Sequence, residues 1–135
     1  MSAAPRTITV AGSPIRLYPA PEPGFAFPWA SFADLLQTAE FPAEAVPFWA
    51  ERWRRIHPKL WAEMDAEMIV PEAAAIGLFE ATRQADWPKA ELAAREFLDG
   101  SRAFFTSLHR HLDLAAFRAA VNEAALRAVV HGVAH

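Results

Sequence analysis

The strongest chemical feature of the sequence is a run of basic residues interleaved with tryptophan near the middle of the chain. Arginine and lysine neutralise phosphates, and tryptophan stacks on nucleic-acid bases or supports arginine side chains. The same residues could instead form a solvated helix face, with Arg52 or Arg55 paired to Glu51 or Glu63 and the tryptophans buried. The apolar spacing of Trp49 and Trp53 favours burial for those two. Both interpretations stay open, so the run is the candidate contact site for DNA or a protein partner. Its members are Arg52, Arg54, Arg55, Lys59 and Trp61.

Histidine is the other residue type that could bind a ligand, and the sequence contains five. His109 and His111 are two positions apart on an expected helix, so they point to different faces and cannot easily share an ion. His131 and His135 have a workable spacing of four, but Gly132 and the chain end disfavour a rigid helix there. No acidic cluster accompanies them. We therefore expect solvated or helix-end histidines and no metal site.

The pattern also lacks a catalytic arrangement. Ser101 and Ser107 have no nucleophile-elbow context, the acidic residues are scattered over expected helix surfaces, and the five glycines do not form a phosphate loop. These observations predict a protein without catalytic residues or cofactor that acts by binding. The alternative is an unrecognised small enzyme of metabolism, with a site assembled from distant residues.

Length and composition limit the remaining classes. A chain of 135 residues fits one domain, expected over residues 7–135 after a loose tail at 1–6. The net charge of −3 does not attract phosphate, so any DNA contact would need the local basic run. The absence of cysteine makes a reducing, cytoplasmic location the natural expectation. No secretory signal is recognisable, and the mid-chain apolar run Ala73 to Phe79 is too short for a membrane span.

Alternating apolar and polar residues predict an N-terminal β-hairpin, while prolines, caps and apolar periodicity divide the rest of the chain into helices. A two-stranded hairpin is marginal alone, so it should rest on helices. The predicted fold is α+β and mainly helical, with a small N-terminal β-hairpin packed on five or six helices. The expected elements are a hairpin over Thr7 to Tyr18, a proline-rich loop over 19–28, a short helix capped by Ser31, a helix from Pro47 to Pro58, a strand over 67–70, a helix over Glu72 to Gln84, a helix starting at Trp87-Pro88, a turn at Asp99-Gly100-Ser101 and a helix over Ser101 to Leu112.

The last helix is expected from Leu114 to about Val130 after a cap at Asp113, with Glu123 four residues before Arg127 as a surface pair. It has two apolar stripes. Two stripes need two partners, either both within the domain or one from another subunit. The second possibility predicts a homodimer in which residues 114–131 form an assembly helix. One stripe contains Leu114, Phe117, Val121, Ala125 and Ala128, and the far side contains Ala119, Leu126 and Val130.

Several motifs, read in order, resemble the N-terminal domain of the Bro family, found in baculovirus Bro proteins and phage antirepressors. They cover residues 7–98. After the hairpin, the motifs are Phe27-Pro28-Trp29 leading into Phe32-Ala33-Asp34-Leu35-Leu36, the basic helix Trp49 to Lys59, Ile69-Val70-Pro71-Glu72 followed by Ile76-Gly77-Leu78-Phe79, and the closing Ala93 to Leu98 with Phe97.

The resemblance implies a regulatory protein without enzymatic activity, similar to an antirepressor or transcription regulator. Pro42 and Pro47 interrupt the region of the family's second helix, and the usual glycine-tyrosine turn is missing. Together with the negative net charge, these departures favour a protein partner over DNA.

Overall fold

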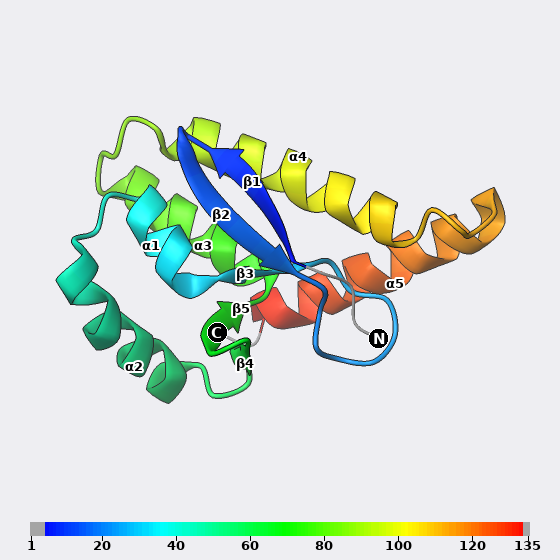
Figure 1. Cartoon of the computed structure of the whole chain (residues 1–135), viewed down its shortest axis with the longest axis horizontal. Coiled ribbons are helices and arrows are strands. Elements are labelled where there is room, and N and C mark those ends of the chain that lie inside the picture. Colours follow the sequence, from blue (N-terminus) through cyan, green and yellow to red (C-terminus); the bar gives the residue numbers. More distant parts are fainter. Residues whose placement is uncertain (1–4, 134–135) are drawn as a thin grey trace.

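The computed structural model describes residues 5–133, and its architecture is α+β with helix predominating. Five antiparallel strands form one sheet in the order β1-β2-β3-β5-β4 (Figure 1). The predicted hairpin is present, but as one edge of this larger sheet, and Arg6, which we assigned to the tail, pairs with Leu17. The strands are β1 (Arg6–Val10), β2 (Ser13–Tyr18), β3 (Trp29–Ser31), β4 (Ala62–Met64) and β5 (Glu67–Val70).

Each hairpin of the sheet turns on two residues with positive φ. Ala11 (49°) and Gly12 (82°) connect β1 to β2, and Asp65 (52°) and Ala66 (63°) connect β4 to β5. Two consecutive positive φ values define a tight turn whose twist matches that of the strands. The first turn contains glycine and was predicted. The second contains none, which is why the sequence pattern gave no sign of β4.

The central strand β3 was also missed. It is three buried residues long, and Ala30 pairs with Leu17 of β2 on one side and Val70 of β5 on the other. Both partners lie far away in the chain, and three residues are too few for an alternating pattern. The predicted strand at 67–70 is confirmed as β5.

The helices pack around this sheet (Figure 1). α4 contacts both β1 and α3, α5 contacts α3, and α1 lies on β2 and β5. Two predicted caps are confirmed, since the Ser31 hydroxyl accepts from the Asp34 amide and the Asp113 carboxylate accepts from the Ala116 amide. The elements are α1 (Phe32–Thr38), the short 3-10 helix η1 (Ala43–Ala45), α2 (Val46–Ile56), α3 (Glu72–Gln84), α4 (Ala90–Leu108) and α5 (Leu114–Val133).

The prediction of a turn at Asp99-Gly100-Ser101 is wrong, because α4 runs without a break through these residues. Gly100 lies where β1 crosses the helix. A Cβ atom added there would be 2.6 Å from Cδ1 of Ile8 and 3.1 Å from its Cγ2. The missing side chain therefore permits close helix–strand packing, a role that local sequence signals cannot distinguish from a turn.

Buried and half-buried carboxylates connect the elements. The Arg16 side chain of β2 is 2.9 Å from both Asp34 of α1 and Glu67 of β5. Glu72 of α3 is 5 % exposed and accepts hydrogen bonds from Ser101 at 2.7 Å and from Arg102 at 2.9 Å. Because each carboxylate has charged or hydroxyl partners, its burial is compensated. These residues stabilise the fold.

The proline-rich loop is held against the inner face of α5. Glu123 accepts a hydrogen bond from the Phe25 amide at 2.6 Å, and Arg127 pairs with Glu22 at 3.2 Å and with Glu123 at 3.4 Å. Gly24 has a φ of +88°, and an added Cβ atom would be 2.5 Å from the Glu123 carboxylate. The loop thus approaches α5 as closely as glycine allows, and the predicted Glu123–Arg127 pair is confirmed.

The apolar stripes of α5 are present with one correction. Ala120 and Ala124 are buried at the centre of the inner face, where Phe27 and Phe105 complete the cluster. Leu114 and Ala125, which we assigned to that face, are exposed, because the contact is centred on Ala120 and Ala124 and these two residues point outward. Ala119, Leu126 and Val130 lie on the opposite side of the helix, as predicted. They are exposed, so the alternative in which both stripes pack within the domain is wrong.

Candidate functional site

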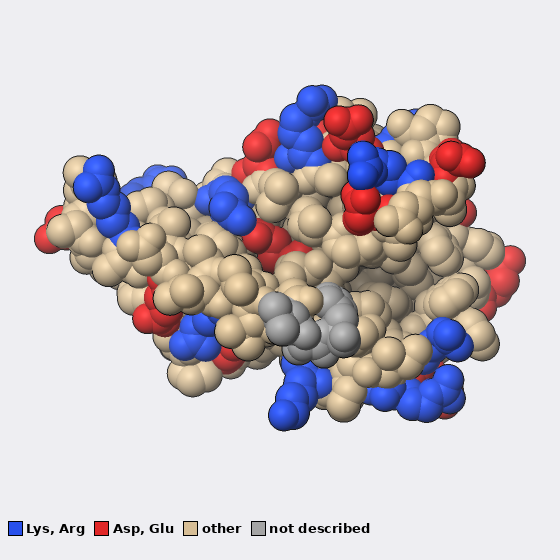
Figure 2. Space-filling view, turned by 180° about the vertical axis from the view of Figure 1, so that it is seen from behind, with Lys and Arg blue, Asp and Glu red and all other residues tan. Residues whose placement is uncertain are grey.

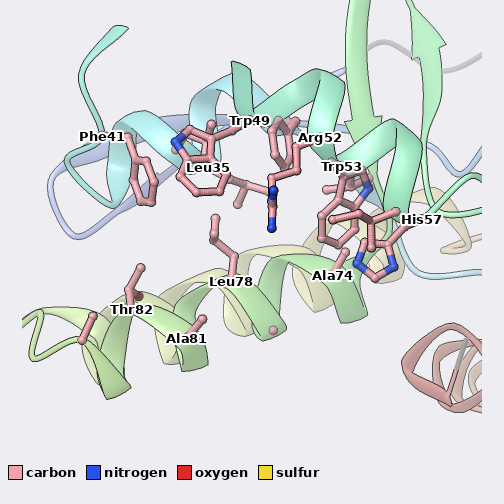
Figure 3. A pocket seen from close by; sticks show the side chains of 16 residues that line it. Leu35, Phe41, Trp49, Arg52, Trp53, His57, Ala74, Leu78, Ala81 and Thr82 are labelled. Carbon is pink, nitrogen blue, oxygen red and sulfur yellow. The ribbon is translucent and has the colours of Figure 1, made fainter. Parts of the chain in front are cut away.

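An apolar groove lies between α2 and α3, with α1 as its floor. Its cavity volume is about 490 Å³, within the range of pockets that bind ligands. Side chains from three separate helices therefore form one concave surface (Figure 3). The lining residues are Phe32, Leu35, Leu36, Phe41, Trp49, Arg52, Trp53, Ile56, His57, Val70, Ala74, Gly77, Leu78, Ala81, Thr82 and Ala85.

The groove exists because α2 stands away from α3. α2 packs mainly on α1, and only Ala50 of its eleven residues is buried. Trp53 anchors the helix by donating from Nε1 to the Leu60 carbonyl at 2.8 Å and by contacting Phe32, whose ring centroid is 5.8 Å away. The facing side of α3 has small residues, and nothing lies within 4 Å of a Cβ atom built at Gly77. Small residues on α3 opposite a peripheral α2 leave the space unfilled.

Arg52 is the cation of this groove. Its guanidinium points from α2 into the space between α2 and α3 (Figure 3). Across the described residues 5–133, no carboxylate forms an ion pair with Arg52. An arginine over apolar walls without a carboxylate partner can bind an incoming anionic group through two parallel hydrogen bonds.

Large apolar side chains are exposed at the edge of the groove. Phe48 is 62 % exposed, Ile56 is 51 % exposed and Trp49 is 37 % exposed. Our expectation that Trp49 is buried is therefore wrong: its ring packs edge-on against Phe41 and Phe48, and it lines the groove. Helical spacing correctly placed Trp49 on the apolar side of α2, but that side faces a groove and not a closed core.

The other residues of the basic run have separate environments. Arg54 lies over the half-buried ring of Trp61, with its guanidinium carbon 5.1 Å from the ring centroid. Arg55 and Lys59 are exposed, and the expected Glu51–Arg55 pair is not formed. In the view from behind, Lys and Arg side chains gather over α2 beside a hollow in the uncharged surface (Figure 2). Only Arg52 of the run reaches the groove.

Sequence reasoning missed the opposite wall of the groove. Leu78, Ala81 and Thr82 of α3 line the groove together with Leu35 of α1. Apolar residues at helical spacing are the ordinary signal of a core face, so their pattern could not show that they face an unfilled space.

The histidines do not form a metal site in the part of the chain that the structure describes, where no group of three potential ligands occurs. His131 is 3.5 Å from Glu22, and its proposed partner His135 lies outside the described residues. His109 packs edge-on against Phe25 and Phe105, and burial there, followed by the proximity of His111, lowers its pKa. His57 stands apart from these at the groove, 4.2 Å from the ring centroid of Trp53.

Within the described residues, no helix combines the length and the apolar character needed to cross a membrane.

Comparison with protein-family models, curated proteins and solved structures found no match to this chain. The case for a function therefore depends on the geometry of the groove.

Proposed function

We propose that this chain is a non-enzymatic regulatory binding module that holds an apolar, acidic segment of a protein partner in the groove between α2 and α3. The observation that carries this proposal is the Arg52 guanidinium, which lies in an apolar groove of about 490 Å³ without a carboxylate partner among residues 5–133. The regulatory role is what the resemblance to the Bro family implies.

The chemistry of the groove supports binding over catalysis. Its polar lining groups are Arg52, His57 and Thr82. Arginine stays protonated at any physiological pH, and the Thr82 hydroxyl already donates to the Phe79 carbonyl at 2.8 Å. The groups present are suited to hold an anion against apolar walls, so we favour a binding module over the alternative of a small metabolic enzyme.

The exposed apolar side chains at the edge of the groove, which form its rim, favour a segment of another chain over a small molecule as the ligand. Phe48 does not line the cavity, but it packs against Trp49 at the edge of the groove and is 62 % exposed. A small molecule enclosed by the cavity would leave Phe48 in water, whereas a helix laid along the groove would cover the rim as well. Tryptophan and arginine are also the residues that contribute most to protein–protein affinity.

The binding test uses a defined probe, a phage-displayed library of helical peptides selected against the immobilised protein. Enriched peptides should have large apolar residues at helical spacing together with an aspartate or glutamate. Their affinity is then measured by fluorescence polarisation on four proteins: the unchanged chain and the variants Ala81→Trp, Arg52→Gln and Arg55→Gln.

The variants have distinct expected effects. Ala81 is exposed and lines the groove, so a tryptophan there fills the groove without entering the core and should abolish binding. Arg52→Gln should weaken binding by about tenfold through the lost charge pair. Arg55→Gln, a matched change on the same helix outside the groove, should leave affinity unchanged. Unchanged affinity in Ala81→Trp, with an unfolding temperature close to that of the parent, would refute the proposal.

DNA is a second candidate, supported by the exposed side chains of Arg55 and Lys59, for which no ion pair occurs within residues 5–133. If these residues contact phosphates, affinity should fall with salt by a log–log slope of about −0.9 per phosphate. Arg55→Gln should then flatten the slope by roughly one unit, while Ala81→Trp should have no effect. The two variants therefore separate DNA binding from peptide binding.

A further inference from the structure

The C-terminal helix α5 has few charged side chains on its exposed face. Glu123 and Arg127 face the proline-rich loop, where they bind the Phe25 amide and Glu22. Among the exposed residues of 114–132, Arg118 is the single charged one. An ordinary surface helix has mainly charged and polar residues on its outer face, whereas the outer face of α5 is mainly apolar. The surface over α5 in the view from behind is correspondingly poor in charge (Figure 2).

The exposed face of α5 also has a regular seam. Ala115, Ala119, Asn122, Leu126 and Val129 follow one another at spacings of four, three, four and three, and all five are exposed. This alternation is the pattern of helices that pair side by side. Leu126 is 69 % exposed and Val129 is 63 % exposed, so the seam loses hydrophobic stabilisation unless another surface covers it.

We propose that this seam pairs with the same seam of a second copy of the chain, in antiparallel orientation. The sizes of the seam residues indicate that the partner is a second copy in antiparallel orientation. The N-terminal half of the seam has the small residues Ala115 and Ala119, and the C-terminal half has the large residues Leu126 and Val129. Antiparallel pairing places small against large along the whole contact, so the face is complementary to itself about a two-fold axis.

Charge and polarity are compatible with the same orientation. In the antiparallel pair the two Arg118 side chains lie more than about 10 Å apart along the helix axis, so their charges do not oppose this arrangement. Asn122 lies near the middle of the seam. A single asparagine there can hydrogen-bond across the pair and thereby favour one register. This inference uses a surface separate from the groove, so it does not depend on the proposed function.

The oligomeric state tests the pairing. Light scattering on the full chain should give twice 14.9 kDa, dissociating on dilution over about two orders of magnitude in concentration. Leu126→Glu should give 14.9 kDa throughout. Leu92→Glu is the matched control, because Leu92 on α4 is 40 % exposed outside the seam, and it should remain dimeric. A monomeric parent chain, or a dimer that survives Leu126→Glu, would overturn the proposal.

The orientation has its own test, made simple by the absence of cysteine from the chain. Ala115→Cys alone should not cross-link to itself with a short thiol-specific reagent, because antiparallel pairing separates the two sites by about 20 Å. A mixture of the Ala115→Cys and Val129→Cys chains should cross-link to a mixed dimer. Efficient self-cross-linking of Ala115→Cys would show parallel pairing and refute the proposed arrangement.

Discussion

Replacing Gly100 with alanine tests whether close packing of α4 on β1 determines the residue at this position. Alanine is more favourable than glycine inside a helix by about 1 kcal/mol. Against this gain, the new Cβ atom would lie 2.6 Å from Cδ1 of Ile8, 3.1 Å from Cγ2 and 3.3 Å from Cβ, all closer than the roughly 3.5–4.0 Å of a favourable carbon contact. The Cδ1 atom can rotate away, but Cβ is fixed to the strand, so β1 must shift.

The expected result is a net loss of stability. Overpacking of this kind costs about 1–3 kcal/mol, so Gly100→Ala should lower the free energy of unfolding by about 1 kcal/mol after the helix gain is subtracted. That corresponds to a fall in unfolding temperature of roughly 3–5 °C for a chain of this size. Urea unfolding followed by circular dichroism measures the change.

Gly77 provides the matched control, because it also lies inside a helix but an added Cβ atom meets nothing within 4 Å. Gly77→Ala should raise the free energy of unfolding by about 0.5–1 kcal/mol. In an Ile8→Val background, which removes the closest atom, the cost of Gly100→Ala should shrink by about 0.5 kcal/mol or more. If Gly100→Ala stabilised the protein as much as Gly77→Ala, the packing explanation would be refuted.

Two further predictions concern the β4–β5 turn and His109. Ala66 has a φ of +63°, which costs a non-glycine residue about 1–2 kcal/mol. Ala66→Gly should therefore raise the free energy of unfolding by about 0.5 kcal/mol after glycine's entropic cost is subtracted. A lower free energy of unfolding in urea would contradict the strain. Burial lowers the pKa of His109 below its ordinary value of 6.5, so the unfolded chain binds the proton first as pH falls, and stability should decrease through pH 6.5 until the folded pKa is reached. Titration of the ring by NMR measures this pKa directly, and His109→Gln should remove that part of the pH dependence. A pKa above 6.5 would contradict the burial argument.

Sequence patterns predicted the features of this fold that act over a few residues. The Gly12 turn, the Ser31 and Asp113 caps and the Glu123–Arg127 pair each depend on residues within four positions of one another, and all are present. Helix spacing also separated the two faces of α5, although it could not place Leu114 on the correct side. Local hydrogen bonds and the helical repeat are properties of a short segment, so a sequence window contains the information they need.

Tertiary structure decided the features that depend on distant partners. β3 forms because Leu17 and Val70 lie on either side of Ala30, and Gly100 remains helical because Ile8 occupies the space where a side chain would be. The basic run predicted Arg52 as a contact residue, but only the position of α2 relative to α3 turns its guanidinium into a groove (Figure 3). Packing between residues far apart in the chain sets these arrangements, and no local periodicity records which partner a side chain will meet.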